Sequence, residues 1–398
     1  MNIQYSHLIP VALGALMAGA CSDSQSDMPV PVADPATYIT FAAPTLNLNA
    51  SIADFADNRF SPSRAKATEV GDFQVWGFCV GRAVQGGQAE STALQEWNDK
   101  SGYFTNTNPV ADLANLNGNT VTAASGLYNN GALTEWHTDD NALHSFIGAT
   151  SSTGNVTFAM QPSGSTTFGD KKSKGPSLKF EITHNSTDIS TPLEIDEQPD
   201  IMVAASFDKK NGSGRVGLSF MHFMTGIRFK LHNHAQQKLT IHSITYGGTF
   251  FKRGFLDFTT DLPELSVDES ATYSGTFTMV RNDQEIASGT SDYMEQNPNR
   301  VLLLLPNPAG TTADDGEYVL GSNKVITVLY NLDGDEPADG PRQYIIDNFT
   351  LNYLPQPNTL HTANLHFVGD EFVVIFQDNS ELNWQNGTNG NRVEITIK

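Results

Sequence analysis

The chain has 398 residues, and its ten histidines are the side chains best suited to hold a metal ion or transfer protons. His232 and His234 flank Asn233, and a His-x-His pair chelates a metal ion when both rings face the same way. His222 lies in an apolar run, and no Asp, Glu or Cys is close to any of the three in the sequence. A hydrogen-bonded or solvated histidine is the commoner situation at each position. We therefore expect no metal centre from the histidines.

Acidic side chains gather in one loop. The run from Asp333 to Asp339 contains four carboxylates, and carboxylate oxygens are the ligands that calcium prefers. Pro337 and the lack of flanking helical patterns depart from an EF-hand. An ordinary acidic hairpin loop is the favoured interpretation, and weak calcium binding stays open.

Motifs of catalysis are missing from the sequence. There is no Gly-x-Ser-x-Gly elbow, no His-Glu-x-x-His helix and no Walker loop. Paired acids such as Asp314 and Asp315 are expected by chance among 44 Asp and Glu residues, so they identify no glycosidase. Cys79 lies in an apolar run, where an inert buried thiol is expected. We predict that the chain is not an enzyme and uses no cofactor.

Three aromatic residues are candidates for a platform on which a sugar ring stacks: Trp97, Tyr128 and Trp136. Such aromatic side chains more often pack in a core or an interface. A glycan site on these rings is therefore the less favoured interpretation.

The first cysteine has a context of its own. Residues 8–20 form an apolar stretch of signal-peptide length, too short to span a bilayer, and end in small residues before Cys21. This arrangement resembles the bacterial lipobox, in which the cysteine thiol is acylated and becomes the mature N-terminus. We predict a lipoprotein signal peptide over residues 1–20 and lipidation at Cys21; a plain signal peptide is the alternative, and residues 1–7 lack Lys and Arg.

Charge and cysteine content narrow the function classes. The formal net charge is −21, which argues against a nucleic-acid binder because nothing offsets phosphate repulsion. Two cysteines cannot form a disulfide framework or a four-thiolate zinc site. Residues 21–36 are polar, with three Asp and three Pro, and this composition predicts a disordered tether.

The body of the chain reads as β-strands. Short runs rich in β-branched and aromatic residues recur between Gly, Asn, Asp and Pro clusters, and many alternate apolar with polar positions. Examples are residues 38–42, 73–80, 177–183, 227–232, 239–245, 325–330, 362–367, 371–376 and 392–398. Residues 301–305 are continuously apolar, which suits a strand buried on both faces. We predict an all-β fold of sandwiches, with short helical candidates only at residues 91–99 and 110–116.

A domain boundary is expected at the polar, glycine-rich run of residues 209–214, near the middle of the chain. It separates a predicted N-terminal β-sandwich over residues 37–213 from a C-terminal one over residues 214–398. The alternative is a hairpin loop inside one domain, because Asn211-Gly212 is also a hairpin turn signal.

Several segments in a fixed order carry a family resemblance. They are residues 60–65 (FSPSRA), residues 73–78 (FQVWGF), Trp136 followed by residues 143–149, residues 198–204 (QPDIMVA), residues 216–231 and residues 383–387 (NWQNG). Together with the lipobox, this order resembles the fimbrillin family of Bacteroidales, the type V pilins and their lipoprotein relatives.

The resemblance implies two transthyretin-like β-sandwich domains and no enzyme activity. It also implies a fimbrial subunit, exported as a lipoprotein, anchored in the outer membrane at the cell surface by acyl chains such as palmitate, and contributing to cell adhesion. Its implied partners are other pilin subunits, an arginine-specific or trypsin-like protease and an adhesion receptor. Shaft, tip and anchor roles all stay open, and so does a surface lipoprotein that binds a glycan or host ligand without polymerising.

The resemblance places the protease cut between Arg64 and Ala65, with Arg59 and Lys66 as other candidates; an ordinary surface arginine is the alternative. Cleavage would remove a strippable first strand within residues 37–64. In that strand Ile39 and Phe41 share one face.

The last seven residues have the pattern of a donor strand. Val393, Ile395 and Ile397 alternate with polar residues after a flexible Gly- and Asn-rich stretch. Such a strand supplies apolar side chains at period two together with main-chain hydrogen bonds. The alternative is that residues 392–398 pair at the edge of their own domain, since any terminal strand shows the same pattern.

Overall fold

The computed structural model describes residues 33–47, 70–80, 117–128, 133–136, 143–161, 167–168, 171–172, 177–183, 193–194, 198–258, 264–280, 283–293, 301–306, 321–336, 340–347, 349, 357 and 360–377. The chain divides into two compact units, residues 1–34 and 35–398. Of the first unit, only Ala33 and Asp34 are among these residues.

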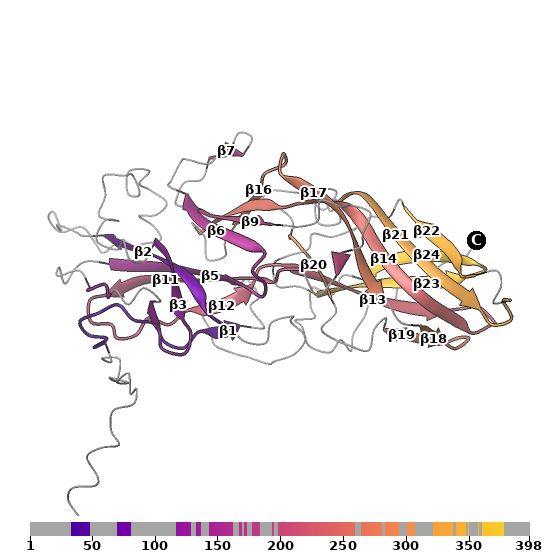
Figure 1. Cartoon of the computed structure of the whole chain (residues 1–398), viewed down its shortest axis with the longest axis horizontal. Coiled ribbons are helices and arrows are strands. Elements are labelled where there is room, and N and C mark those ends of the chain that lie inside the picture. The colour runs from indigo at the N-terminus through magenta and orange to yellow at the C-terminus, as the bar shows by residue number, and fades with distance from the viewer. Residues whose placement is uncertain are drawn as a thin grey trace, which may run out of the picture. The chain divides into compact units, whose positions relative to one another are not determined.

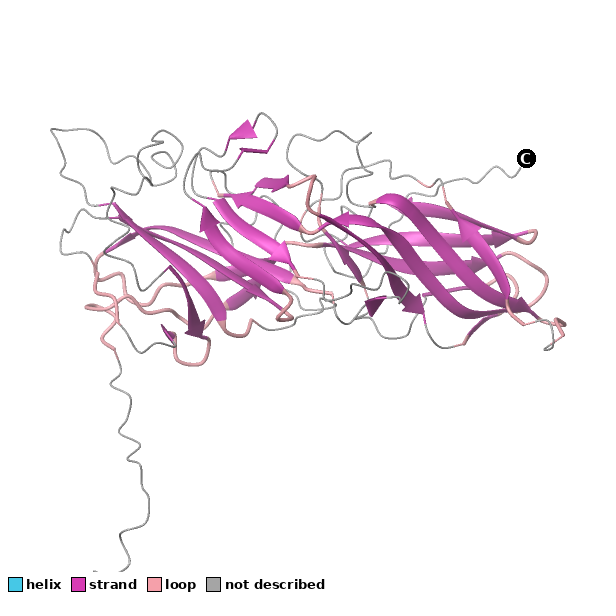
Figure 2. Ribbon diagram, turned by 45° about the horizontal axis from the view of Figure 1, so that its top comes forward, coloured by secondary structure: helices cyan, strands magenta, loops and turns pink. Residues whose placement is uncertain are grey.

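The fold is all-β, as predicted, and every regular element in the described ranges is a strand (Figures 1 and 2). The strands are β1 (Thr45–Asn47), β2 (Phe73–Val80), β3 (Asn117–Thr122), β4 (Leu127–Tyr128), β5 (Leu143–Ser151), β6 (Val156–Gln161), β7 (Thr167–Phe168), β8 (Lys171–Lys172), β9 (Ser177–Ile182), β10 (Leu193–Glu194), β11 (Ile201–Lys210), β12 (Ser219–His222), β13 (Thr225–Asn233), β14 (Leu239–Phe251), β15 (Arg253–Asp257), β16 (Glu264–Val267), β17 (Thr272–Val280), β18 (Gln284–Ile286), β19 (Ser291–Tyr293), β20 (Leu302–Leu304), β21 (Ser322–Leu332), β22 (Arg342–Ile346), β23 (Leu360–Val368) and β24 (Glu371–Gln377). Within these ranges no helix is long and apolar enough to cross a membrane.

Four large sheets make up the second unit. A seven-stranded sheet has the order β1-β12-β11-β5-β2-β3-β4, and a four-stranded sheet has the order β16-β15-β9-β6. Further along the chain, β10-β17-β14-β21-β22 with β18 form a six-stranded sheet, and β19-β13-β23-β24 with β20 form a five-stranded sheet. Strands β7 and β8 pair separately.

Two hydrophobic cores lie between pairs of these sheets, because alternating strand residues point to opposite faces. The middle core joins the seven-stranded and four-stranded sheets and includes Ile147, Val203, Phe180 and Leu256. The C-terminal core joins the six-stranded and five-stranded sheets. It includes buried residues of β13, β14, β21 and β23: Ile227, Phe229, Leu231, Ile241, Tyr246, Ile326, Val328, Leu365 and Phe367.

The apolar run of residues 301–305 contributes to both cores. Val301, Leu303 and Leu305 belong to the middle core, whereas Leu302 and Leu304 belong to the C-terminal core. All five side chains are buried, so the predicted burial on both faces is confirmed. One short strand therefore ties the two cores together through its two faces.

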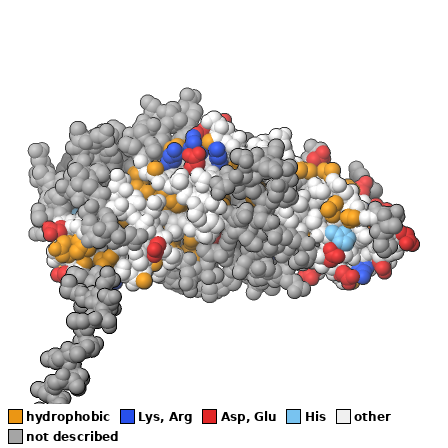
Figure 3. All heavy atoms as spheres, viewed as in Figure 1, with side chains coloured by type: hydrophobic (Ala, Val, Ile, Leu, Met, Phe, Trp, Pro, Cys, Tyr) orange, Lys and Arg blue, Asp and Glu red, His pale blue; other side chains and the backbone are white. Residues whose placement is uncertain are grey.

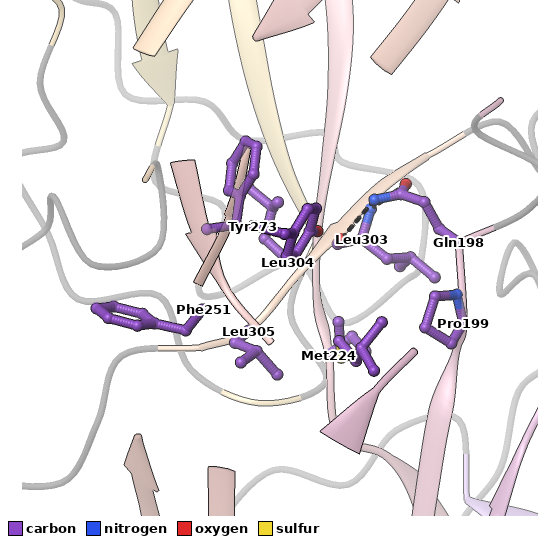
Figure 4. A pocket seen from close by; sticks show the side chains of 10 residues that line it. Gln198, Pro199, Met224, Phe251, Tyr273, Leu303, Leu304 and Leu305 are labelled. Carbon is purple, nitrogen blue, oxygen red and sulfur yellow. Dashed lines mark hydrogen bonds between the residues drawn. The ribbon is translucent and has the colours of Figure 1, made fainter. Parts of the chain in front are cut away.

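A buried glutamine fixes the backbone of this strand. The Gln198 side-chain amide donates from Nε2 to the Leu303 carbonyl at 2.8 Å, and the Leu303 N–H donates to Gln198 Oε1 at 3.0 Å. Figure 4 shows this pair beside Pro199, Met224 and Leu305. The amide supplies a donor and an acceptor, as a neighbouring strand would.

The polar run of residues 209–214 covers the end of β11 and the start of the connection to β12, and these two strands pair antiparallel in the seven-stranded sheet. The alternative interpretation, a hairpin loop at Asn211-Gly212 inside one domain, fits this turn because β12 belongs to the same sheet as β11. The division of the chain into two sandwich domains stays a prediction.

The outer face of the four-stranded sheet carries an ion-pair network. Arg253 donates to both carboxylate oxygens of Glu181, at 3.0 and 2.9 Å, and to Asp268 at 3.0 Å. The Arg253 hydrogen bond lowers the pKa of the Glu181 carboxyl. On the face drawn in Figure 3, charged side chains gather in a few places, in keeping with a chain that is only 17% charged.

The Gln198 pair gives a first prediction. Gln198→Ala leaves the Leu303 N–H and carbonyl buried without the amide, so we expect the free energy of unfolding to fall by about 1–3 kcal/mol. Urea unfolding measures the change. Gln343→Ala, at an exposed position of β22, is the control and should stay within about 0.5 kcal/mol of the parent. Equal effects of the two substitutions would contradict the role given to Gln198.

Candidate functional site

The candidate site is the N-terminal segment, residues 35–47, and the surface on which it lies. Its main chain bonds three separate parts of the fold. Ile39 N–H donates to Thr134 O at 2.8 Å, and Phe41 N–H donates to Gly126 O at 3.0 Å. The third part is the chain immediately before β12, and the next residues of the segment form main-chain hydrogen bonds with it.

That third set of bonds runs along residues 216–221. Ala42 N–H donates to Val216 O at 2.9 Å, and Val216 N–H donates to Thr40 O at 2.7 Å. Strand β1 then pairs in parallel with β12, with Thr45 opposite Ser219. β1 is consequently the edge strand of the seven-stranded sheet, and it covers an edge that β12 would otherwise present.

The segment differs in form from the predicted strand. Residues 38–42 are extended, with isolated bridges from Tyr38 to Glu135 and from Phe41 to Val216, and the first strand is β1 instead. The physical reason is that the partners of residues 38–42 belong to three different segments, so no continuous ladder forms.

Two apolar side chains anchor the segment. Ile39 and Phe41 are both 0% exposed, on the shared face that the alternation predicts. The Phe41 ring packs edge-on against Phe73 and Phe146, with ring centroids 5.8 and 5.7 Å apart. Aromatic pairs in this arrangement are stabilising beyond the area that they bury.

These contacts belong to a third hydrophobic core, the N-terminal core, on the second face of the seven-stranded sheet. Its members are Ile39, Phe41, Phe73, Val75, Val121, Trp136, Phe146, Met202, Ala204, Val216, Leu218 and Phe220. Along β11, Met202 and Ala204 face this core, and Ile201 and Val203 face the middle core. The sheet is thus buried on both faces, and the N-terminal segment is part of the cover of one face.

Trp136 helps to hold the segment. Its side chain is 4% exposed, and its indole Nε1 donates to Pro35 O at 3.0 Å. The ring packs edge-on against His144 at a centroid distance of 4.9 Å. A ring buried in this way offers no face to a sugar. Trp97 and the Tyr128 side chain, the other two candidates for a platform, lie outside what the structure describes.

Gly126 allows the closest approach of the segment to the sheet. Its φ is +71°, and a Cβ built there would lie 2.0 Å from Phe41 O. Only glycine combines this left-handed backbone with such a contact. Any side chain at residue 126 would push residues 40–42 away from the sheet.

A buried Asp–His pair fixes the strand that receives β1. His222 Nδ1 lies 2.9 Å from Asp200 Oδ2, and the two side chains are 1% and 2% exposed. The Asp200 N–H also donates to Ser152 Oγ at 2.9 Å. Local pattern does not reveal an acid near His222, because Asp200 precedes it by 22 residues and the pairing of β11 with β12 brings the two together.

The His-x-His pair does face one way, and a third histidine joins it. The rings of His232 and His366 stack with centroids 4.4 Å apart, and His234 Nε2 lies 3.0 Å from His366 Nδ1. His232 Nε2 bonds Asn364 Oδ1 at 3.0 Å. Among the described residues no group of three or more His, Cys, Asp or Glu is arranged to hold a metal ion.

Burial changes the acidity of this histidine stack. Desolvation, followed by the charges of His232 and His234, lowers the pKa of His366 to about 4. Desolvation also lowers the pKa of His232, and Lys230 acts in the same direction. The folded protein therefore favours neutral rings at these two positions.

In the acidic loop, Asp335 already has partners. Its Oδ1 accepts from Arg342 at 2.6 Å, and its Oδ2 accepts from the Leu332 N–H at 2.8 Å. These bonds suit an ordinary hairpin loop between β21 and β22. Asp339 is outside the described residues.

Several predicted site residues also lie outside the described residues. They are Cys21, Arg59, Arg64, Ala65, Lys66, Val393, Ile395 and Ile397. Cys79 lies in β2, where the main chain is described and the side chain is not.

Comparisons with known proteins give distant likenesses. No protein-family model matches the chain, and no curated protein matches it. Among solved structures, a fimbrial protein from Bacteroides vulgatus is 14% identical, covering 86% of this chain and 99% of its own length, with a TM-score of 0.47. The fimbrial anchor protein Mfa2 from Porphyromonas gingivalis is 9% identical, covering 83% of this chain and 94% of its own length, with a TM-score of 0.31. These likenesses assign neither a family nor a function to this chain.

Gly126 gives a prediction about the segment. Gly126→Ala should lower the free energy of unfolding by about 2–4 kcal/mol, because strain at positive φ adds to the contact with Phe41 O. It should also speed the release of the segment by trypsin, followed by mass spectrometry. Gly289→Ala is a matched control: its φ is +70°, nothing lies within 4 Å of its Cβ, and we expect a cost of about 1 kcal/mol with unchanged proteolysis. Equal proteolysis of the two variants would contradict the proposed seating.

The histidine stack gives a prediction about pH. The lowered pKa values mean that the unfolded chain binds more protons than the folded chain between about pH 4 and the ordinary histidine pKa near 6.5. Stability is thus fully present above about pH 6.5 and falls as the pH drops toward 4. We expect His366→Gln to reduce the loss of urea midpoint between pH 7.5 and pH 5. His242→Gln, beside Asp283, is the control; an unchanged pH dependence in His366→Gln would refute the assignment.

Proposed function

We propose that this chain is a fimbrial subunit, exported as a lipoprotein and assembled when proteolysis removes its N-terminal segment. The observation that carries the proposal is the seating of residues 35–47. The segment covers one face of a sheet through Ile39 and Phe41, and it completes the sheet edge through β1. Both kinds of contact end when the segment leaves.

Removal has a calculable cost. Each fully buried Ile or Phe side chain stabilises the fold by about 1.5–3 kcal/mol, so Ile39 and Phe41 together contribute about 3–6 kcal/mol. That is a large part of the 5–15 kcal/mol typical of a folded domain. A chain that has lost the segment gains by binding a replacement with the same pattern.

The replacement has defined requirements. It needs apolar side chains for the positions of Ile39 and Phe41, and main-chain groups for Val216, Leu218 and the β12 edge. The predicted donor strand, with Val393, Ile395 and Ile397 on one face, offers both. In this proposal the donor comes from a second subunit, of the same or another kind.

In the proposed order of events, export as a lipoprotein comes first and proteolytic maturation follows. Lipidation at Cys21 holds the subunit in the outer membrane, since each buried methylene of an acyl chain contributes about 0.8 kcal/mol. An arginine-specific or trypsin-like protease then cuts between Arg64 and Ala65, which frees residues 21–64 with the segment and the acyl chains. The subunit joins a surface fimbrium that contributes to adhesion through a receptor. A subunit that escapes the cut keeps its acyl chains and serves as an anchor.

The experiment is N-terminal sequencing of the protein taken from the cell surface, combined with protease treatment of the purified chain. A start at Ala65 and SDS-resistant, heat-sensitive ladders after cleavage are expected. Arg64→Gln should abolish both, because arginine-specific cleavage at this bond is lost. Arg59→Gln is the matched control and should mature normally.

A start at Cys21 on every surface molecule, or a cleaved chain that stays monomeric, would overturn the proposal. If Arg59→Gln instead blocks maturation, the cut is at residue 59 and the assignment of Arg64 is wrong.

A further inference from the structure

A polar cavity lies at the corner where the chain passes from the seven-stranded to the four-stranded sheet. Its volume is about 380 Å³, within the range of small-ligand sites. The start of β2, β3, the end of β5 and the start of β6 form its walls. We propose that this cavity binds a neutral saccharide. The proposal goes beyond the fimbrial function and does not depend on it.

The cavity exists because the two sheets have different widths. β6 is the last strand of the four-stranded sheet, whereas the seven-stranded sheet continues from β5 to β2 and β3. Gln74 is directly opposite Ala149 on one side and Thr120 on the other, so the three share one face. Ala149 packs in the middle core, and the polar pair Gln74 and Thr120 continues that face into the cavity.

Hydrogen-bonding groups dominate the lining. Besides Gln74 and Thr120, the cavity is lined by Thr150, Ser151, Thr153 and Thr157. A side-chain amide and several hydroxyls both donate and accept, as the hydroxyl groups of a sugar require. Phe158, which packs partly against the middle core, supplies an apolar surface for the C–H face of a sugar ring.

One carboxylate, that of Asp72, is also among the hydrogen-bonding groups of the cavity. Asp72 lines the cavity, and its Oδ1 accepts from the Ala123 N–H at 3.0 Å, which restrains the orientation of the carboxylate. The Asp72 main chain is held in turn by Thr150, whose Oγ1 donates to Asp72 O at 2.8 Å. A carboxylate oriented by the protein is a strong acceptor for sugar hydroxyls.

Charge selects a neutral ligand. Among the described residues that line the cavity there is no Lys, Arg or His, so none of them offsets the charge of a sialic acid, a uronic acid or a phosphate. Asp72 itself repels such groups. Within the described lining, a single carboxylate is too small a ligand set for a divalent cation.

The volume favours a short saccharide over a peptide. It accommodates on the order of one or two sugar rings. A peptide adding to the edge of β6 would instead run along the strand from Val156 to Gln161 and beyond the cavity. That outcome is distinguishable in the experiment below.

Saturation-transfer NMR on the intact protein tests the proposal, with the methyl glycosides of glucose, galactose, mannose, fucose, N-acetylglucosamine and N-acetylgalactosamine. We expect at least one to bind. Asp72→Asn, which keeps an acceptor for Ala123, and Thr120→Val should each weaken that binding at least tenfold. Thr272→Val, at an exposed position of β17, should leave it unchanged, and equal unfolding midpoints check that all variants fold.

Three results would overturn the proposal: no binding by any of the six glycosides, equal binding by methyl glucuronide, or binding that both cavity variants retain. Displacement of a bound glycoside by an extended peptide that pairs with β6 would also count against a dedicated sugar site. A failure of fimbrial assembly leaves these results untouched, since among the described residues Phe73 alone belongs both to the cavity lining and to the N-terminal core.

Discussion

A β-sheet with apolar residues on both faces must be covered on both faces, and the seven-stranded sheet of this protein meets that requirement in two different ways. Strand β11 shows it most directly, with Ile201 and Val203 facing one core and Met202 and Ala204 facing another. The four-stranded sheet covers the first face. The second face is covered in part by residues 35–44, which are extended but form no regular strand and lead directly into β1.

This difference gives the N-terminal segment its functional interest. A sheet is held in place by many cooperative hydrogen bonds, whereas residues 38–42 are held by two anchoring side chains and bonds to three separate segments. In the proposed function this cover detaches when the chain is cut beyond it, and its loss would expose an apolar face and the β12 edge. The Asp200–His222 pair lies within the receiving surface, whereas the Gly126 contact and the Trp136 bond to Pro35 join that surface to the segment.

Local pattern predicted much of this structure. Period-two alternation identified β2, β9, β21 and β24 closely, and the apolar run of residues 301–305 was correctly expected to be buried on both faces. The shared face of Ile39 and Phe41 was also read correctly, although their regular strand was not, because its partners are scattered. Features that depend on pairing between distant segments cannot be predicted from local pattern. They are the contact of Asp200 with His222, the contact of His366 with His232, and the cavity where two sheets of unequal width meet. Trp136 is a candidate sugar platform from sequence alone, because no local pattern distinguishes an exposed indole from one that bonds Pro35.

The most direct test of the account uses a chain that begins at Ala65 and a synthetic peptide of residues 35–47. Hydrogen exchange by mass spectrometry should show faster exchange in β11 and β12 of the shortened chain than in the full chain, with the C-terminal core unchanged. The peptide should bind and restore slow exchange, and the same peptide with Phe41→Ala should not. Unchanged exchange in β12 on removal of the segment, or no binding of the peptide, would contradict the central claim that residues 35–47 are a detachable cover of the sheet.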